Sequence, residues 1–142
     1  MNGRMKKQRN TSLIAKGEYT AWCPSILTRV SVASADGKHR VDDAIALWDT
    51  GATDCFVSRR LIDELKLKKI GEMDVRYADE RVVTKDVYLV RLTFQPSGRE
   101  IEIYASDTGE DSQDFIIGMN IIRNGRFLLE PTEDGVSFTF TI

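Results

Sequence analysis

The stretch Ala46–Thr53 constrains this chain most, because it delivers a carboxylate at the end of an apolar run. Residues 46–48 are apolar, Asp49 follows them, and Thr50 and Gly51 come directly after. An ionised carboxylate in a partly dry place is costly unless polar neighbours hold it. Gly51 lets a second backbone approach closely, and the Thr50 hydroxyl can hold the loop. The stretch therefore predicts an aspartate positioned for chemistry.

A second apolar run lies far downstream, at Phe115–Ile122. It breaks at Gly118, and a brief helix is expected over Asn120–Arg123, ended by Asn124 and Gly125. Each motif alone is common, whereas their order and spacing together are more specific.

Together the two motifs resemble the retropepsin-like aspartic proteases, the family of retroviral proteases and their cellular and bacterial relatives. The resemblance covers roughly Ile26 to the C-terminus. It implies a mainly β fold, a small closed β-barrel with two short helices and one lobe per chain. It also implies that one chain supplies half of an active site, so that Asp49 of each subunit faces its twin in a symmetric homodimer.

By this resemblance, the two Asp49 carboxylates activate a water that hydrolyses peptide bonds in extended, partly apolar segments. Thr50 would brace the two loops across the dimer axis, and Gly51 would offer its carbonyl to the substrate backbone. The expected substrate-binding residues come from the loop, the apolar walls and a candidate flap: Leu47, Ala52, Thr53, Asp54, Phe56, Tyr77, Ala78, Asp79 and Ile116. For Leu47, Phe56 and Ile116, core packing is an equally good explanation.

The candidate flap consists of two expected strands, Met73–Tyr77 and Arg81–Phe94. Family flaps usually carry glycines at the tip, and this chain has none between the two strands. An acid–arginine ion pair of retroviral members is also absent, because Thr53 and Met119 stand at its positions. These departures leave two alternatives open: an ordinary exposed hairpin here, and a catalytically silent retropepsin-like dimer that serves as a peptide-binding or assembly module.

Size and charge limit the other functions. With 142 residues, the chain is too short for a two-lobed, pepsin-like enzyme. We expect one domain over residues 18–142 after a flexible basic tail, residues 1–17. The net charge of -2 gives no general attraction to nucleic acid or anionic membranes. Lys16 interrupts the only apolar run of the tail, so no signal peptide is expected and the cytoplasm is the expected location.

No metal or cofactor is expected. The chain has one histidine, His39, in a predicted turn, and its two cysteines, Cys23 and Cys55, are far apart and outside any CxxC pattern. Free thiols are therefore expected. The acidic loop of residues 106–114 lacks the ligand spacing and central glycine of a calcium loop.

The remaining pattern is mainly that of short strands. Asp36 and Gly37 predict a hairpin whose return strand, residues 38–48, aims Asp49. Ser58 is a good N-cap for a helix over Arg59–Leu67. The alternation over Val136–Ile142 could bury one face on the chain's own core or help to pair two subunits.

Overall fold

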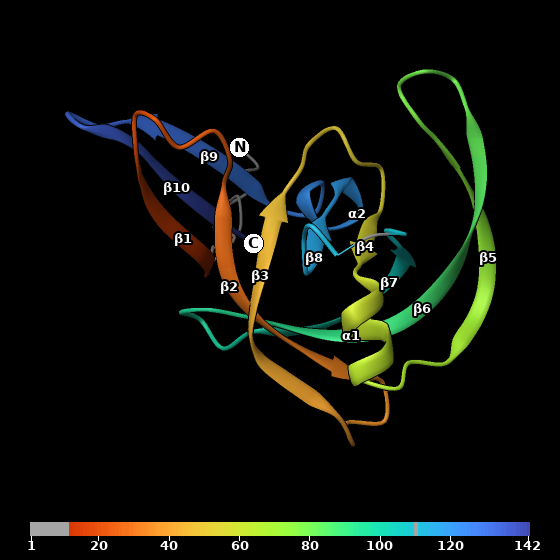
Figure 1. The fold of residues 1–142 in the computed structure, drawn as a ribbon. Coiled ribbons are helices and arrows are strands. Elements are labelled where there is room, and N and C mark those ends of the chain that lie inside the picture. The colour runs from red at the N-terminus through yellow and green to blue at the C-terminus, as the bar shows by residue number, and fades with distance from the viewer. Residues whose placement is uncertain (1–11, 110) are drawn as a thin grey trace, which may run out of the picture.

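The computed structural model describes residues 12–109 and 111–142 (Figure 1). Its elements follow in chain order: β1 (Leu13–Thr20), β2 (Leu27–Ser34), β3 (Arg40–Trp48), β4 (Cys55–Val57), α1 (Arg59–Glu64), β5 (Lys69–Arg76), β6 (Val82–Phe94), β7 (Glu100–Asp107), β8 (Phe115–Ile117), α2 (Met119–Ile122), β9 (Arg126–Pro131) and β10 (Gly135–Thr141). No helix in these two described ranges is long and apolar enough to cross a bilayer.

Six strands close a barrel. They follow one another in the order β2-β3-β8-β4-β7-β6, and β6 pairs again with β2. β8 is parallel to β3 and antiparallel to β4, so it lies between the strand that ends before Asp49 and the strand that begins after it. The expected fold, a mainly β closed barrel with two short helices, is confirmed.

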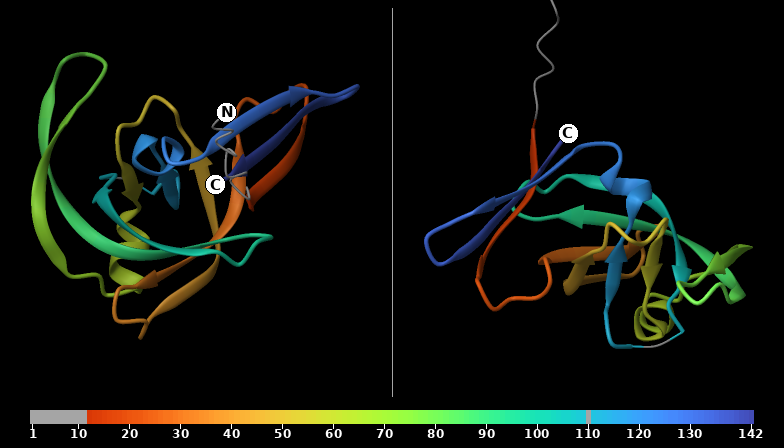
Figure 2. Two further views of the ribbon diagram at one scale, coloured as in Figure 1. Left: turned by 180° about the vertical axis from the view of Figure 1, so that it is seen from behind. Right: turned by 90° about the horizontal axis from the view of Figure 1, so that it is seen from above.

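A second sheet of three strands lies beside the barrel, in the order β1-β10-β9 (Figure 2). The expected tail boundary at Gly17 is wrong, because β1 starts at Leu13 and pairs with β10 along its length. This pairing buries Ile14 and Ala15 completely. The short apolar run of residues 13–15 did not predict a strand, because β10, the strand with which it pairs, lies at the opposite end of the chain. Residues 1–11 of the expected tail fall outside the described residues.

The two sheets pack together around Trp48. Its ring lies 4.9 Å from the ring of Phe138, 5.0 Å from Phe140, 5.9 Å from Phe94 and 6.2 Å from Phe127, measured between centroids. Phe138 and Phe140 are fully buried. The alternation of the last strand therefore serves the chain's own core, and both edges of β10 are occupied by β1 and β9.

The hairpin and the first helix form where their turn and cap residues predicted them. Gly37 takes the positive φ of 73° that such a turn requires. The Ser58 side chain accepts a hydrogen bond from the Leu61 backbone N–H, as expected of an N-cap. The helix is shorter than expected, because it ends at Glu64 and Lys66 has a φ of 49°.

β5 and the first half of β6 form a hairpin that projects from the barrel (Figure 1, right). Its cross-strand register runs from Lys69 opposite Tyr88 to Arg76 opposite Val82. This flap hairpin, residues 69–88, stands where the resemblance placed a flap.

Candidate active site

A rigid strand end positions Asp49. Trp48, the residue before it, is 5% exposed, and its indole Nε1 donates a 2.9 Å hydrogen bond to Thr28 Oγ1. The backbone N–H of Asp49 then donates a hydrogen bond of 2.9 Å to the carbonyl of Ile117 in β8. Because these anchors are buried, the direction in which the loop leaves the barrel is fixed.

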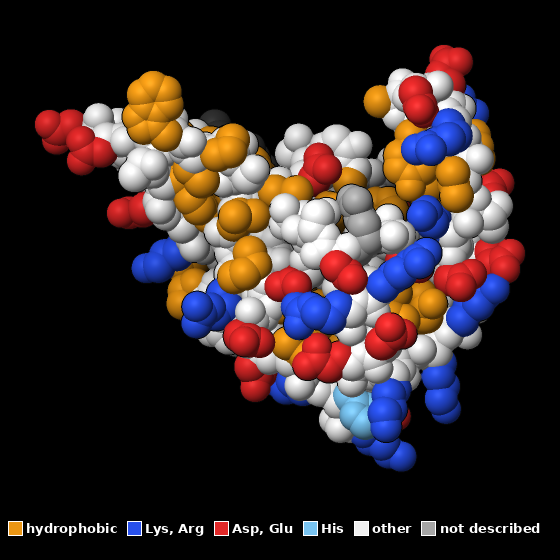
Figure 3. Space-filling view, in the orientation of Figure 1, with side chains coloured by type: hydrophobic (Ala, Val, Ile, Leu, Met, Phe, Trp, Pro, Cys, Tyr) orange, Lys and Arg blue, Asp and Glu red, His pale blue; other side chains and the backbone are white. Residues whose placement is uncertain are grey.

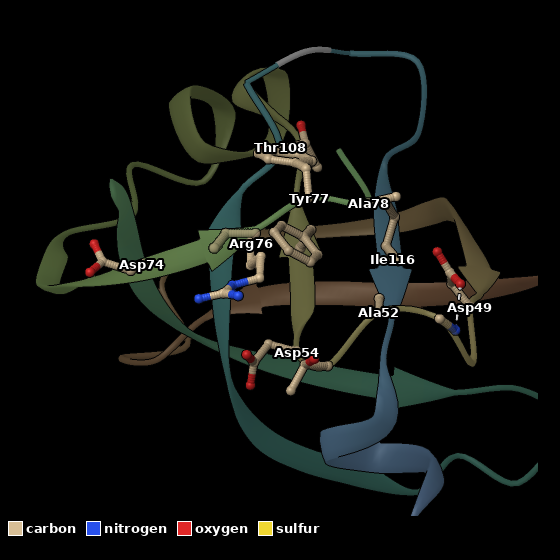
Figure 4. A pocket seen from close by; sticks show the side chains of 13 residues that line it. Asp49, Ala52, Asp54, Asp74, Arg76, Tyr77, Ala78, Thr108 and Ile116 are labelled. Atoms are coloured by element: carbon tan, nitrogen blue, oxygen red, sulfur yellow. Dashed lines mark hydrogen bonds between the residues drawn. The ribbon is translucent and has the colours of Figure 1, made fainter. Parts of the chain in front are cut away.

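The Asp49 carboxylate is held on one side only. Gly51 donates its backbone N–H to Asp49 Oδ1 at 2.8 Å (Figure 4, dashed line), and Ala52 donates to the Asp49 carbonyl at 3.2 Å. Within the described part of the chain, Oδ2 accepts no hydrogen bond, and the side chain is half-buried. One carboxylate oxygen is thus available to a water, a substrate or a second carboxylate.

The second motif supports the loop. Gly118 packs so tightly that a Cβ there would lie 2.2 Å from the carbonyl oxygen of Asp54 and 2.9 Å from that of Ala52. Directly after it, Met119 N donates to Ala52 O at 2.8 Å, and Asn120 N donates to Thr53 O at 3.1 Å. Only glycine permits this approach, so the start of α2 and the loop form one unit.

Cys55 adds a buried link at the start of β4. Its Sγ donates to Asn120 Oδ1 at 3.1 Å. Burial raises the pKa of this thiol to about 12, so it stays neutral at ordinary pH. Cys23 and Cys55 are both free, and Cys55 is buried.

A cleft of about 460 Å³ lies between this loop and the flap hairpin (Figure 4). The space-filling view shows the molecule hollowed on this side, between the flap hairpin at the upper right and the rest of the chain (Figure 3). The lining residues come from the loop, β4, β5, the flap turn, the end of β7 and β8: Asp49, Gly51, Ala52, Thr53, Asp54, Phe56, Asp74, Val75, Arg76, Tyr77, Ala78, Thr108 and Ile116.

Most of the predicted site residues line this cleft, but three do not: Leu47, Thr50 and Asp79. Leu47 is half-buried beside Ile116, its partner in β8. Thr50 is exposed at the turn that follows Asp49. The Asp79 carboxylate accepts a hydrogen bond from the Arg81 N–H at 3.1 Å, which holds it in the flap turn.

Four lining residues were not predicted: Asp74, Val75, Arg76 and Thr108. The first three lie on β5, and Thr108 follows β7. Alternating charge on a strand is typical of a solvated surface, so only the position of the flap hairpin over the loop shows that these residues face a cleft.

The flap turn is ordered without glycine. Glu80 adopts the left-handed conformation, with a φ of 66°, that glycine would otherwise supply. Tyr77 N donates to Arg81 O and Glu80 N donates to Tyr77 O, both at 2.9 Å. The Arg81 guanidinium lies 4.7 Å from the centroid of the Tyr77 ring, a favourable cation–π distance.

Carboxylates of the acidic loop serve the fold. Asp107 accepts from Gly109 N at 2.7 Å, Asp111 from Arg60 N at 2.9 Å, and Asp114 from Ile45 N at 3.0 Å. No group of three or more metal-ligating side chains occurs within the described ranges. Glu110, a member of that loop, lies outside them.

Comparison with known proteins agrees with this architecture. The family model described as "Aspartyl protease" matches residues 28–121, more than half of the chain. No curated protein sequence matches. Among solved structures, EIAV protease in complex with the inhibitor HBY-793 is 17% identical, with a TM-score of 0.52 over 76% of this chain and 93% of that one.

Two further solved structures are similar. The Simian Foamy Virus (mac) protease is 18% identical, with a TM-score of 0.49 over 69% of this chain and 92% of that one. A retropepsin-like aspartic protease from Rickettsia conorii is 15% identical, with a TM-score of 0.45 over 92% of this chain and 94% of that one. On the family match across the loop and its supporting helix, the chain belongs to the aspartyl protease family.

Proposed function

We propose that this protein is an aspartic endopeptidase that acts as a homodimer, with Asp49 of each subunit as the catalytic carboxylate. The observation that carries the proposal is the Asp49 side chain in the lining of the cleft, where Oδ1 accepts a hydrogen bond from Gly51 and Oδ2 accepts none from the described residues. Asp-Thr-Gly occurs twice in the chain, at residues 49–51 and 107–109, but the Asp107 carboxylate accepts a hydrogen bond from Gly109 N and forms an ion pair with Arg59. Of these two aspartates, only Asp49, in the catalytic loop of residues 49–54, lines the cleft, so a second catalytic carboxylate must come from a second copy.

The chemistry follows from two carboxylates placed close together. Peptide hydrolysis needs a base that takes a proton from water and an acid that protonates the amide. In aspartic proteases generally, two neighbouring carboxylates share one proton, because like charges so close cannot both ionise, and the pair can then do both tasks. In this proposal, the two Asp49 side chains hold the water between them, and Thr50 braces the two loops.

The substrate is an extended, partly apolar peptide segment. Ala52, Phe56 and Ile116 give the cleft an apolar floor beside Asp49, which suits uncharged side chains next to the cleaved bond. Gly51 and Asp54 would bind the peptide backbone from the loop side, while Tyr77 and Ala78 would do so from the flap turn. Such a strand-like binding mode favours unfolded or processed segments.

The other predicted residues have places at the margin of this cleft. Leu47 supports Ile116 from the neighbouring strand, and Thr53 lines the cleft. Asp79 would reach the substrate only when the flap turn closes. We propose no metal, cofactor, nucleic acid or membrane for this function, and two free thiols suit a reducing compartment such as the cytoplasm.

The direct test is cleavage of an unfolded protein by the wild type and by Asp49→Asn, from about pH 4 to 7 over a range of protein concentrations. Asparagine keeps the shape of the side chain but cannot share a proton. Asp43→Asn, an exposed carboxylate on β3, is the matched control. Cleavage by the wild type and the control alone supports the proposal. Absence of cleavage by a folded wild-type dimer would instead favour a silent peptide-binding module.

A further inference from the structure

The outer edge of β9 is an unpaired strand edge. In the sheet order β1-β10-β9, the middle strand has neighbours on both sides, whereas β9 has a neighbour on one side only. Its outer edge accepts and donates no backbone hydrogen bond among residues 12–109 and 111–142. Such an edge is a template for another strand.

The hairpin register identifies which groups of β9 face outward. Thr132 N donates to Gly135 O at 2.9 Å at the start of the ladder between β9 and β10. Alternate residues of an antiparallel strand bond to the same neighbour, so residues 130, 128 and 126 bond to β10. Phe127 and Leu129 consequently direct their N–H and C=O groups to the open edge.

Two copies of this edge fit each other in one antiparallel register. When Phe127 of one copy exchanges hydrogen bonds with Leu129 of the other, Leu128 lies opposite its twin and Arg126 lies opposite Glu130. Opposite charges then face each other twice, once on each side of the symmetry axis. A shift in one direction would place Pro131, which has no N–H, in a hydrogen-bonding position. A shift of the register in the other direction would move Arg126 of one copy away from Glu130 of the other.

In a single chain, the apolar side chain on this strand is partly exposed to solvent, and its charged side chains have no ion-pair partner among the described residues. Leu129 is 45% exposed, and Arg126 and Glu130 are exposed. Neither charged residue forms an ion pair within the part of the chain that the structure describes. Pairing of two edges would cover Leu129 with the second copy's Phe127 and would satisfy both charges.

This edge is also coupled to the catalytic loop. The Phe127 ring contacts Trp48 at 6.2 Å between centroids, and Trp48 directly precedes Asp49. β9 begins shortly after α2, whose first residues bond to the loop carbonyls. The open edge of β9 therefore belongs to a strand that contacts or directly follows the elements that hold the catalytic loop.

We propose that β9 pairs antiparallel with β9 of a second copy, in the register that sets Arg126 opposite Glu130, and that this pairing joins the two halves of the active site. The inference rests on the proposed function, because it names the surface that the dimer uses. It differs from mutual exchange of terminal strands, since β1 and β10 are already paired within one chain.

Two charge-reversed variants test the register. Arg126→Glu makes both positions negative and Glu130→Arg makes both positive, so each variant alone should dimerise at least about tenfold more weakly than the wild type. An equal mixture of the two should recover dimers and cleavage, because every facing pair is then of opposite charge. Arg99→Glu and Glu100→Arg, exposed charges where β6 turns into β7 and outside β9, are the matched controls. Sedimentation velocity measures the dimer fraction, and circular dichroism confirms folding.

The outcomes separate this inference from the proposed function. Dimers that persist in both variants would overturn the β9 interface while leaving a dimeric protease intact. Variants that are monomeric both alone and when mixed would overturn the register. A wild type that is monomeric at every concentration would overturn the homodimer itself.

Discussion

The backbone N–H of Asp49 lies 2.9 Å from the carbonyl oxygen of Ile117 and donates a hydrogen bond to it. This bond continues the parallel pairing of Trp48 with Ile117 one residue beyond the end of β3. Ile117 is fully buried, so the proposed catalytic residue starts from a part of the barrel that cannot shift without disturbing the core.

Replacement of Gly118 by alanine should damage both stability and activity. The new Cβ would meet the Asp54 carbonyl at 2.2 Å, so the loop or α2 must move. We expect a loss of about 2–3 kcal/mol in the free energy of unfolding and a large loss of kcat/KM. Urea denaturation measures the first, with Gly71→Ala as control, because a Cβ there meets nothing within 4 Å. Equal stability of the two variants would show that the loop does not need this close contact.

The hydrogen bond between Trp48 and Thr28 should make a measurable contribution to stability. Thr28→Val removes the acceptor and leaves a buried indole N–H without a partner, which costs about 1–3 kcal/mol. Trp48→Phe removes the donor, and the double variant should lose less than the sum of the two single losses, because no donor or acceptor is stranded. If chemical denaturation showed that the double variant loses as much unfolding free energy as the two single variants together, this account would be contradicted.

Cys55 should be protected from thiol reagents, and Cys23 should not. Burial raises the pKa of Cys55 to about 12 and hides its sulfur, whereas Cys23 lies half-buried in a loop. At pH 8 a thiol-specific reagent should label one cysteine in the native protein and both in denaturant. Cys23→Ser is the control, since it should show no native labelling. Rapid native labelling of that variant would disprove the burial.

The same thiol predicts a loss of stability in alkali. Its folded pKa is raised above the ordinary value of 9, so its contribution is complete below pH 9. As the pH rises from 9 toward 12, the thiol ionises in the unfolded chain first, and the folded state loses stability. Cys55→Ala should show a shallower decline of unfolding free energy over this interval, measured at several pH values. If the unfolding free energy of the wild type and of Cys55→Ala fell equally steeply with pH, groups other than Cys55 would be responsible for the alkaline loss of stability.

Local features that are determined by the chemistry of a few neighbouring residues could be predicted from the sequence. The loop after Trp48, the turn at Gly37 and the cap at Ser58 each depend on residues that are neighbours in the chain. Pairing across the whole chain could not be predicted in the same way. The burial of Ile14 depends on β10, and its surroundings read as a polar terminus.

The cleft residues show the same limit. Ala52, Phe56 and Ile116 were expected from the loop and the apolar runs, and they line the cleft. Arg76 was not expected, because a charged residue on a half-exposed strand has no periodicity that distinguishes a cleft from solvent. Its position follows from the three-dimensional path of the flap hairpin, which no local pattern encodes.

Mixing of active and inactive subunits tests the shared site most directly. Wild type and Asp49→Asn are combined at equal total concentration, allowed to exchange, and assayed for cleavage of one peptide, with sedimentation confirming that both remain dimers. If each site needs two Asp49 carboxylates, an equal mixture retains about one quarter of the wild-type activity, because only that fraction of randomly formed dimers carries both. Retention of one half would mean that each chain works alone, and would contradict the account.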